Sequence, residues 1–114
     1  MLLNEGMNEL ADQFADLIAK GQWGTGTTAA TTSDTGLETA VATTLITPTS
    51  ANSGASAQFT HTLPSTTGNG NSLIEYELQF TNGDSLTRSV GTAIAKTASF
   101  RIITISTINF VRGN

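Results

Sequence analysis

The sequence predicts a mainly β protein: a single-domain β-sandwich or small barrel of five to seven strands with one N-terminal amphipathic helix. Threonine is the commonest of the 114 residues, and its branched Cβ favours extended backbone. A helical period of apolar residues occurs only near the N-terminus, and later segments alternate apolar and polar side chains at roughly ten-residue spacing. At this length we expect one domain, residues 1–114. It divides into a helix (1–21), a Gly/Thr-rich connection (22–36) and a β domain (37–114).

Residues 7–20 are predicted to form the helix, because their apolar side chains recur at intervals of three and four. Acidic residues near its start and Lys20 near its end suit the helix dipole, and Gly21 is the expected C-cap. With Leu3 the stripe resembles a coiled-coil seam, but it covers about two heptads, fewer than a coiled coil needs, so we favour a helix lying on a sheet. This stripe and one later aromatic residue are the candidate subunit-contact residues: Leu3, Met7, Leu10, Phe14, Leu17 and Trp23.

Five later segments are predicted strands, and two Gly- and Asn-rich segments are predicted turns. The strands are residues 37–49, 56–64, 72–80, 85–90 and 99–111, and the turns are residues 66–71 and 82–84. The strand 72–80 alternates most regularly, which predicts a core face (Ile74, Tyr76, Leu78, Phe80) and a solvent face (Glu75, Glu77, Gln79). The segment 99–111 has apolar side chains on both faces, so we expect a central strand, or one covered by the helix or a neighbouring subunit.

Composition and charge exclude several classes of function. Charged residues make up 12% of the chain, and the formal net charge is −4. The basic residues are too scattered to neutralise a phosphate backbone, so no nucleic-acid partner is expected. Without cysteine there is no disulfide, thiolate nucleophile or Cys-type zinc site. No apolar run is long enough for a membrane span, and the first residues lack the pattern of a Sec signal peptide. We expect no cofactor, no metal and no membrane partner.

Two tripeptides in residues 24–41 suggest enzymatic interpretations. Gly24-Thr25-Gly26 fits a loose dinucleotide-loop pattern, but such a loop follows a strand and opens a helix, whereas here a helix is followed by an extended Thr-rich segment. Asp34-Thr35-Gly36 spells the aspartic-protease signature, but that chemistry needs aspartates buried in apolar loops, and the flank here is polar. We interpret these residues as a turn, in which Asp34 caps backbone N–H groups and Gly36 takes a positive φ.

The remaining candidate residues are isolated. His61 has no second His or Cys partner, so we expect a partly buried strand histidine and no metal ligand. Glu75 and Glu77 lie about 7 Å apart, as inverting glycosidase carboxylates do, although a solvated strand face is the commoner setting for such a pair. Trp23 and Tyr76 are too few for a carbohydrate platform, although Trp23 could anchor an interface. We predict no catalytic residue and no enzyme activity.

The first 45 residues or so contain the segments "LNEGMNELADQFADLIAKGQ", "GTGTTA" and "DTGLE", followed by Val41. These segments resemble small virion proteins of tailed bacteriophages, which open with "LN-x-G-x-N" and a short helix and continue close to "GTGTTAPTxxDTGLExPV". The departures are Ala30 and Ala40, where proline is frequent. The resemblance implies a structural virion component of the head surface or of the tail and fibre apparatus, with no catalytic residues to carry over.

We therefore predict a non-enzymatic virion protein that acts by subunit association. A capsid decoration or cement protein is favoured, because the chain is one small domain without the repetitive shaft of a fibre. The alternatives are a tail, baseplate or tail-fibre component, and a host-receptor or glycan-binding module, which would need aromatic residues around its turns. The expected partners are other virion proteins, either the major capsid protein or tail proteins, and further copies of the chain, for which a trimer is compatible with the helix stripe.

Overall fold

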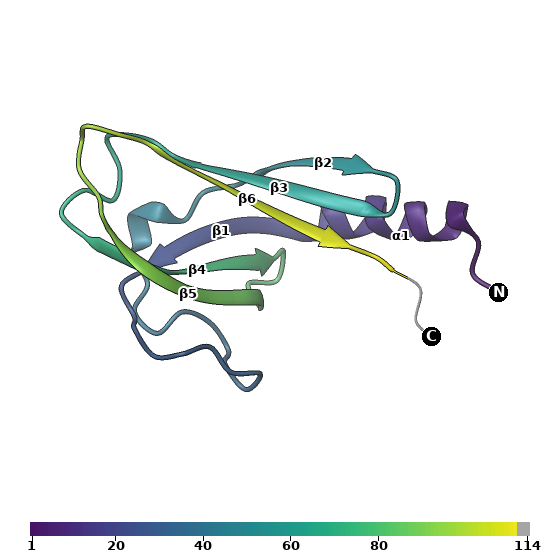
Figure 1. Cartoon of the computed structure of the whole chain (residues 1–114), viewed down its shortest axis with the longest axis horizontal. Coiled ribbons are helices and arrows are strands. Elements are labelled where there is room, and N and C mark those ends of the chain that lie inside the picture. The colour runs from purple at the N-terminus through teal and green to yellow at the C-terminus, as the bar shows by residue number, and fades with distance from the viewer. Residues whose placement is uncertain (112–114) are drawn as a thin grey trace.

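The structure is a computed structural model that describes residues 1–111 (Figure 1). Its elements are α1 (Asn4–Leu17), β1 (Ile18–Gly24), the 3-10 turn η1 (Ala42–Thr44), β2 (Thr49–Ser53), β3 (Ser56–Leu63), β4 (Ser72–Phe80), β5 (Ser85–Ala95) and β6 (Ile102–Asn109). The predicted mainly β class with one N-terminal helix is confirmed. The strand predicted at 72–80 is β4, and the turn at 82–84 leads into β5, which extends beyond the predicted residue 90.

Two antiparallel three-stranded sheets form a sandwich around one apolar core. The strand order is β1–β4–β5 in one sheet and β2–β3–β6 in the other. Phe59 of β3, Leu78 of β4 and Ala15 of α1 are buried members of this core, so both sheets and the helix contribute to it. The predicted core face of β4 is confirmed at Tyr76 and Leu78, which are 6% and 0% exposed.

Helix α1 ends at Leu17, so the predicted helix end at residue 20 and the predicted C-cap Gly21 are wrong. Ile18 already has extended backbone (φ −91°, ψ 117°), because the chain pairs with β4 from this residue onward. Gly21 lies inside β1, and a Cβ there would stand 2.5 Å from the Tyr76 hydroxyl oxygen, so the glycine allows Tyr76 to pack between the sheets. Cross-strand pairing outweighs the helical period of the local sequence.

The helix packs against the side of the β2–β3–β6 sheet that faces the core. Met7 is buried, and the Phe14 ring contacts Phe59, Phe80 and Phe110 edge-on, with ring centroids 6.2, 6.3 and 5.4 Å apart. These rings come from β3, from the end of β4 and from the residue after β6. The prediction that the helix lies on a sheet is therefore confirmed.

Residues 25–47, the covering segment, begin over the outward face of the β1–β4–β5 sheet, where residues 26, 38 and 39 bind Glu75, and continue along the free edge of β1. Ala40 and Ile46 form isolated bridges to β1, and η1 interrupts the segment between them. The predicted strand at 37–49 is therefore wrong, as is the predicted connection at 22–36, whose first residues belong to β1. A buried threonine replaces the missing ladder, because the Thr44 hydroxyl accepts from the backbone N–H of Trp23 at 2.9 Å and lies within hydrogen-bonding distance of two backbone carbonyls.

Strand β6 lies at the edge of its sheet, where β3 is its one neighbour. Of the alternatives predicted for this segment, the central strand is therefore wrong, and cover by a neighbouring subunit stays a prediction. On the core side of β6, Ile108 packs against the core, whereas Ile103 and Ile105 on the other side are 49% and 59% exposed. Sheet order depends on contacts between distant segments, which the alternation within one strand does not encode.

Candidate functional site

The Gly-Thr-Gly tripeptide and residues 38 and 39 meet a buried carboxylate, Glu75 of β4. Its side chain is fully buried and accepts backbone N–H groups of Gly26, Glu38 and Thr39, each at 2.8 Å. It also accepts the Arg88 Nε–H at 2.9 Å. Burial by itself would raise the pKa of the Glu75 carboxyl, but these hydrogen bonds outweigh burial and hold the pKa below its ordinary value. Glu75 therefore fastens the covering segment to the sheet as an ionised group.

Arg88 of β5 completes this arrangement, which we call the Glu75 clasp (Glu75, Arg88, Asp34 and the backbone groups they bind). Its Nη1 contacts the Asp34 carboxylate at 2.9 Å, and its Nη2 donates to the Thr28 carbonyl at 2.8 Å. All three guanidinium nitrogens are thus used, and the carboxylates hold the Arg88 pKa above its ordinary value. The arginine joins the sheet to two points of the covering segment.

The geometry of the clasp disfavours a phosphate at the Gly-Thr-Gly tripeptide. A strand precedes the tripeptide, as a dinucleotide loop requires, but no helix follows it. The backbone N–H of Gly26 donates to Glu75, and a Cβ on Gly24 would stand 2.5 Å from the same carboxylate. A negative charge occupies the position that would have to receive the pyrophosphate.

Asp34 lies on the surface, in the turn that its sequence predicts. Its carboxylate accepts the Thr31 N–H at 2.9 Å and the Thr31 hydroxyl at 3.0 Å, which confirms the predicted capping role. The Thr31 bonds and Arg88 lower the Asp34 pKa, whereas a protease dyad needs one carboxyl that keeps its proton. Gly36 has no positive φ, so that detail of the predicted turn is wrong.

The predicted solvent face of β4 is also wrong. Glu75 is 0% and Glu77 3% exposed, because the covering segment lies over them. One Glu77 oxygen accepts the Gln79 amide at 2.5 Å. A signal for this cluster exists in the sequence, since the predicted hairpin places Arg88 directly opposite Glu77 and two residue pairs from Glu75, on the same side of the sheet.

His61 is fully buried, more deeply than expected. Its Nε2 lies 3.0 Å from the Gly21 carbonyl and 3.1 Å from the Thr44 carbonyl, so Nε2 carries the proton and donates to them. Burial lowers the pKa of the imidazole and keeps it neutral. Among the described residues no group of three or more His, Cys, Asp or Glu side chains could hold a metal ion.

The six candidate subunit-contact residues differ in how exposed the structure leaves them. Met7 and Phe14 belong to the chain's own core, whereas Leu3, Leu10 and Leu17 are 63%, 49% and 49% exposed. These three leucines recur every seven residues, so Leu10 and Leu17 lie on one flank of α1 and Leu3 directly precedes the helix on that flank. The sixth residue, Trp23, packs against Tyr76 with ring centroids 5.1 Å apart.

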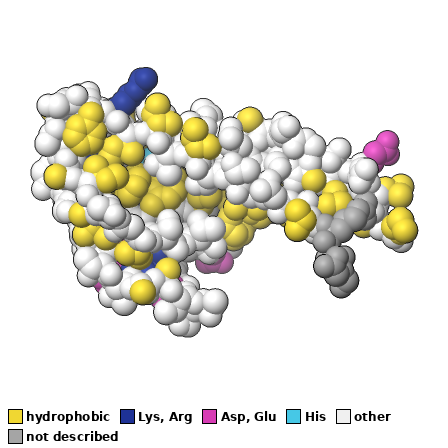
Figure 2. Space-filling model, in the orientation of Figure 1, with side chains coloured by type: hydrophobic (Ala, Val, Ile, Leu, Met, Phe, Trp, Pro, Cys, Tyr) yellow, Lys and Arg dark blue, Asp and Glu magenta, His cyan; other side chains and the backbone are white. Residues whose placement is uncertain are grey.

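A second surface lies on the side of the β2–β3–β6 sheet that points away from the core. We call it the outer face; it is formed by Thr49, Ala51, Gln58, Thr60, Thr62, Ile103, Ile105 and Thr107. None of the three strands contains Asp, Glu, Lys or Arg. More generally, few charged side chains are visible in Figure 2, where apolar side chains gather toward both ends of the viewed surface.

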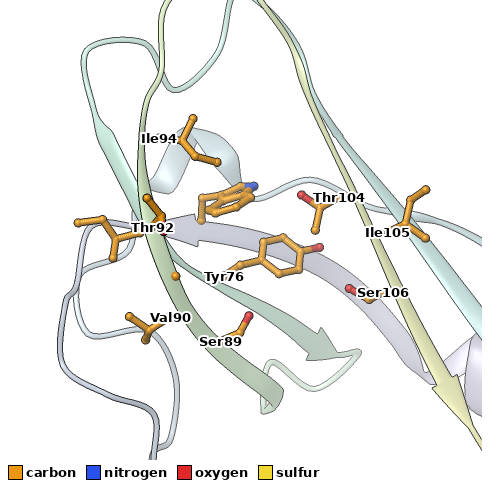
Figure 3. A pocket seen from close by; sticks show the side chains of 11 residues that line it. Tyr76, Ser89, Val90, Thr92, Ile94, Thr104, Ile105 and Ser106 are labelled. Carbon is orange, nitrogen blue, oxygen red and sulfur yellow. The ribbon is translucent and has the colours of Figure 1, made fainter.

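A cavity of about 300 Å³, the β5–β6 cavity, opens between the edge strands β5 and β6 (Figure 3). Trp23, Ile74 and Tyr76 line it together with residues 89–92 and 94 of β5 and 104–106 of β6. None of the described residues lining it is charged. The Trp23 indole N–H and the Tyr76 hydroxyl are both buried and have no hydrogen-bond partner within the described part of the chain.

Comparison of the chain with protein-family models, curated proteins and solved structures gave no match. Within residues 1–111 no helix is long and apolar enough to cross a membrane.

Proposed function

We propose that this chain is a non-enzymatic structural protein of a tailed-phage virion that acts by subunit association, as a capsid decoration protein. The observation that carries the proposal is the outer face, an uncharged sheet surface with two half-exposed isoleucines. The resemblance of residues 24–41 to phage virion proteins supports the class of particle. The single small domain favours decoration over a fibre.

The outer face and the edge strand β6 lack the features that usually prevent a sheet from associating with another protein chain. Exposed edges are usually protected by charged side chains, proline or bulges, and β6 has none of these between Ile102 and Asn109. Ile103 and Ile105 expose apolar surface beside threonine side chains, which lose little hydration energy on burial compared with charged groups. Such a surface is suited to contact with another protein subunit.

The rest of the chain provides a rigid support for this contact. The Glu75 clasp fixes the covering segment on the opposite side of the molecule, and α1 closes the core beneath β3. Leu3, Leu10 and Leu17 offer a second apolar strip on the helix, which could join copies to one another while the outer face contacts the capsid.

A charge placed on the outer face tests the association. Ile105→Lys should weaken self-association or capsid binding at least about tenfold, because a lysine would have to be buried without a partner. The matched control is Leu45→Lys, which changes a 41% exposed leucine in the covering segment. Sedimentation velocity on the purified protein and co-sedimentation with capsids lacking it give the readouts. Equal binding by the wild-type and Ile105→Lys proteins would contradict the role of the outer face.

Localisation tests the class of particle. Cryo-electron microscopy of virions from the phage that encodes this chain should show many copies on the capsid lattice. A few copies at the tail would overturn decoration in favour of a tail component, and absence from purified particles would overturn the virion assignment itself.

A further inference from the structure

We propose that the β5–β6 cavity binds a small, uncharged, mainly apolar ligand that carries a carbonyl-type hydrogen-bond acceptor. This inference goes beyond subunit association and does not depend on it. The volume of about 300 Å³ is at the lower end of the range for small-molecule sites. Both walls are edge strands, so no further strand of the described chain closes the opening.

The walls determine the polarity of the ligand. Ile74 and Ile94 supply apolar surface together with the Trp23 and Tyr76 rings, and small hydroxyl side chains of β5 and β6 lie between them (Figure 3). An ionised ligand would lose its hydration here without meeting an opposite charge, which costs several kcal/mol. An uncharged ligand loses little hydration and gains apolar contact.

The interior determines the hydrogen-bonding group of the ligand. Tyr76 is 6% exposed and its hydroxyl has no partner within the described part of the chain, and the same holds for the buried Trp23 Nε1. The two rings are neighbours in the cavity wall, with ring centroids 5.1 Å apart. In Figure 3 the Tyr76 hydroxyl is directed toward the β6 side of the cavity, where Thr104 and Ser106 lie.

These two polar groups favour an acceptor. An indole nitrogen can only donate, and burial raises the pKa of Tyr76, so the phenol stays protonated and can donate as well. A buried donor without a partner is costly, and a carbonyl oxygen removes that cost. A ligand with an apolar body and a carbonyl group therefore matches both the walls and the interior.

The single tryptophan of the chain allows ligand binding in the cavity to be followed by NMR. Trp23 is the one tryptophan in the sequence, so the ¹⁵N-labelled protein has a single indole N–H resonance, and this resonance comes from the cavity. Three probes of similar size separate the features of the proposal. Acetophenone is neutral with a carbonyl, ethylbenzene is neutral without an acceptor, and benzoate is charged.

Acetophenone should shift the indole resonance saturably, with a Kd on the order of 1 mM for a ligand of this size. Ethylbenzene should bind more weakly, and benzoate should not bind. Tyr76→Phe should weaken acetophenone binding about two- to tenfold and leave folding stability undiminished, because the hydroxyl loses no partner in the free protein.

A filling variant tests the location. Gly91→Leu projects a side chain into the cavity from a position where a Cβ meets no atom within 4 Å, and it should abolish binding. Thr62→Leu on the outer face is the matched control and should bind as the wild type does. If the circular dichroism spectrum shows that Gly91→Leu is unfolded, Ser89→Leu replaces it.

Three outcomes would overturn the proposal: no saturable shift with acetophenone, equal binding of benzoate, or unchanged binding in a folded filling variant. A filling variant that changes the oligomeric state of the protein would also overturn it, by assigning the cavity to a subunit interface.

Discussion

The sheet β1–β4–β5 carries Glu75, Glu77 and Arg88 on its outward side, whereas the strands of the sheet β2–β3–β6 contain no charged residue. The first outward side is covered by the first part of the covering segment, whose residues 26, 38 and 39 bind Glu75, and the second is bare. Of the two sheets, the one whose outward side is covered carries the charged groups, and these buried polar groups fix the covering segment in one position. The bare sheet lacks the charges that would oppose contact with another protein. The two sheets share a core but face different surroundings.

Among substitutions that test the difference between the two sheets, removing the charge of Glu75 should lower folding stability the most. Glu75→Gln leaves Arg88 without its buried partner and turns an amide toward backbone donors, so we expect a loss of about 3–5 kcal/mol in the free energy of unfolding. Urea denaturation followed by circular dichroism measures this loss. The control Glu5→Gln, at an exposed helix position, should change stability by less than about 0.5 kcal/mol. Similar stabilities of the two variants would show that the covering segment is held by other contacts.

Acid should weaken the covered sheet in a smaller and graded way. The folded pKa of Glu75 is below its ordinary value of 4.5, so the unfolded chain takes up the proton more readily than the folded chain. The contribution of the clasp to stability is complete above about pH 4.5 and is lost as the pH falls through the folded pKa.

His61 should cause a further loss of stability that begins at a higher pH than the loss due to Glu75. Its pKa is lowered by burial from 6.5, so its contribution is present above pH 6.5 and declines as the pH falls below that value. Urea midpoints measured across this range should fall in two stages in the wild type. Glu75→Gln should retain the stage due to His61 and lose much of the lower stage. An unchanged lower stage in that variant would assign it to other carboxylates.

We expect the smallest effect on folding stability from a substitution on the outer face of the β2–β3–β6 sheet. Ile103→Thr shortens a side chain that is already 49% exposed, and it should change the free energy of unfolding by about 0.5 kcal/mol or less. If the outer face is a contact surface, the same variant should still weaken association measurably by sedimentation. A large loss of folding stability would show that Ile103 serves the chain's own core and would weaken the contrast between the two sheets.

The sequence pattern within single segments correctly predicted the strand β4, part of its core face and the turn into β5. Alternation in residues 72–80 identified β4 and its core face, and the Asn-Gly-Asp segment identified the turn into β5, where Gly83 has φ 90°. The helix end was missed, because β1 forms through pairing with a strand more than 50 residues later. The edge position of β6 was missed for the same reason.

The candidate site was less predictable, because its groups are brought together by distant segments. The bond from the Gly26 N–H to Glu75 spans 49 residues, and that from Arg88 to the Thr28 carbonyl spans 60. Alternation in β4 showed which residues share a side, but it gave no information on what covers that side. Arg88 opposite Glu77 was the one available signal, since hairpin register follows from the turn.

The pairing of β1 with β4 also has a consequence for synthesis. When α1 and β1 leave the ribosome, the strand that completes their sheet has not yet been made, and neither has the carboxylate that fixes the covering segment. The first 45 residues must therefore wait, with apolar side chains uncovered, until translation has passed residue 80. Folding begins late in translation and is slow compared with that of helical domains, so this interval is when the nascent chain is most open to aggregation or chaperone binding.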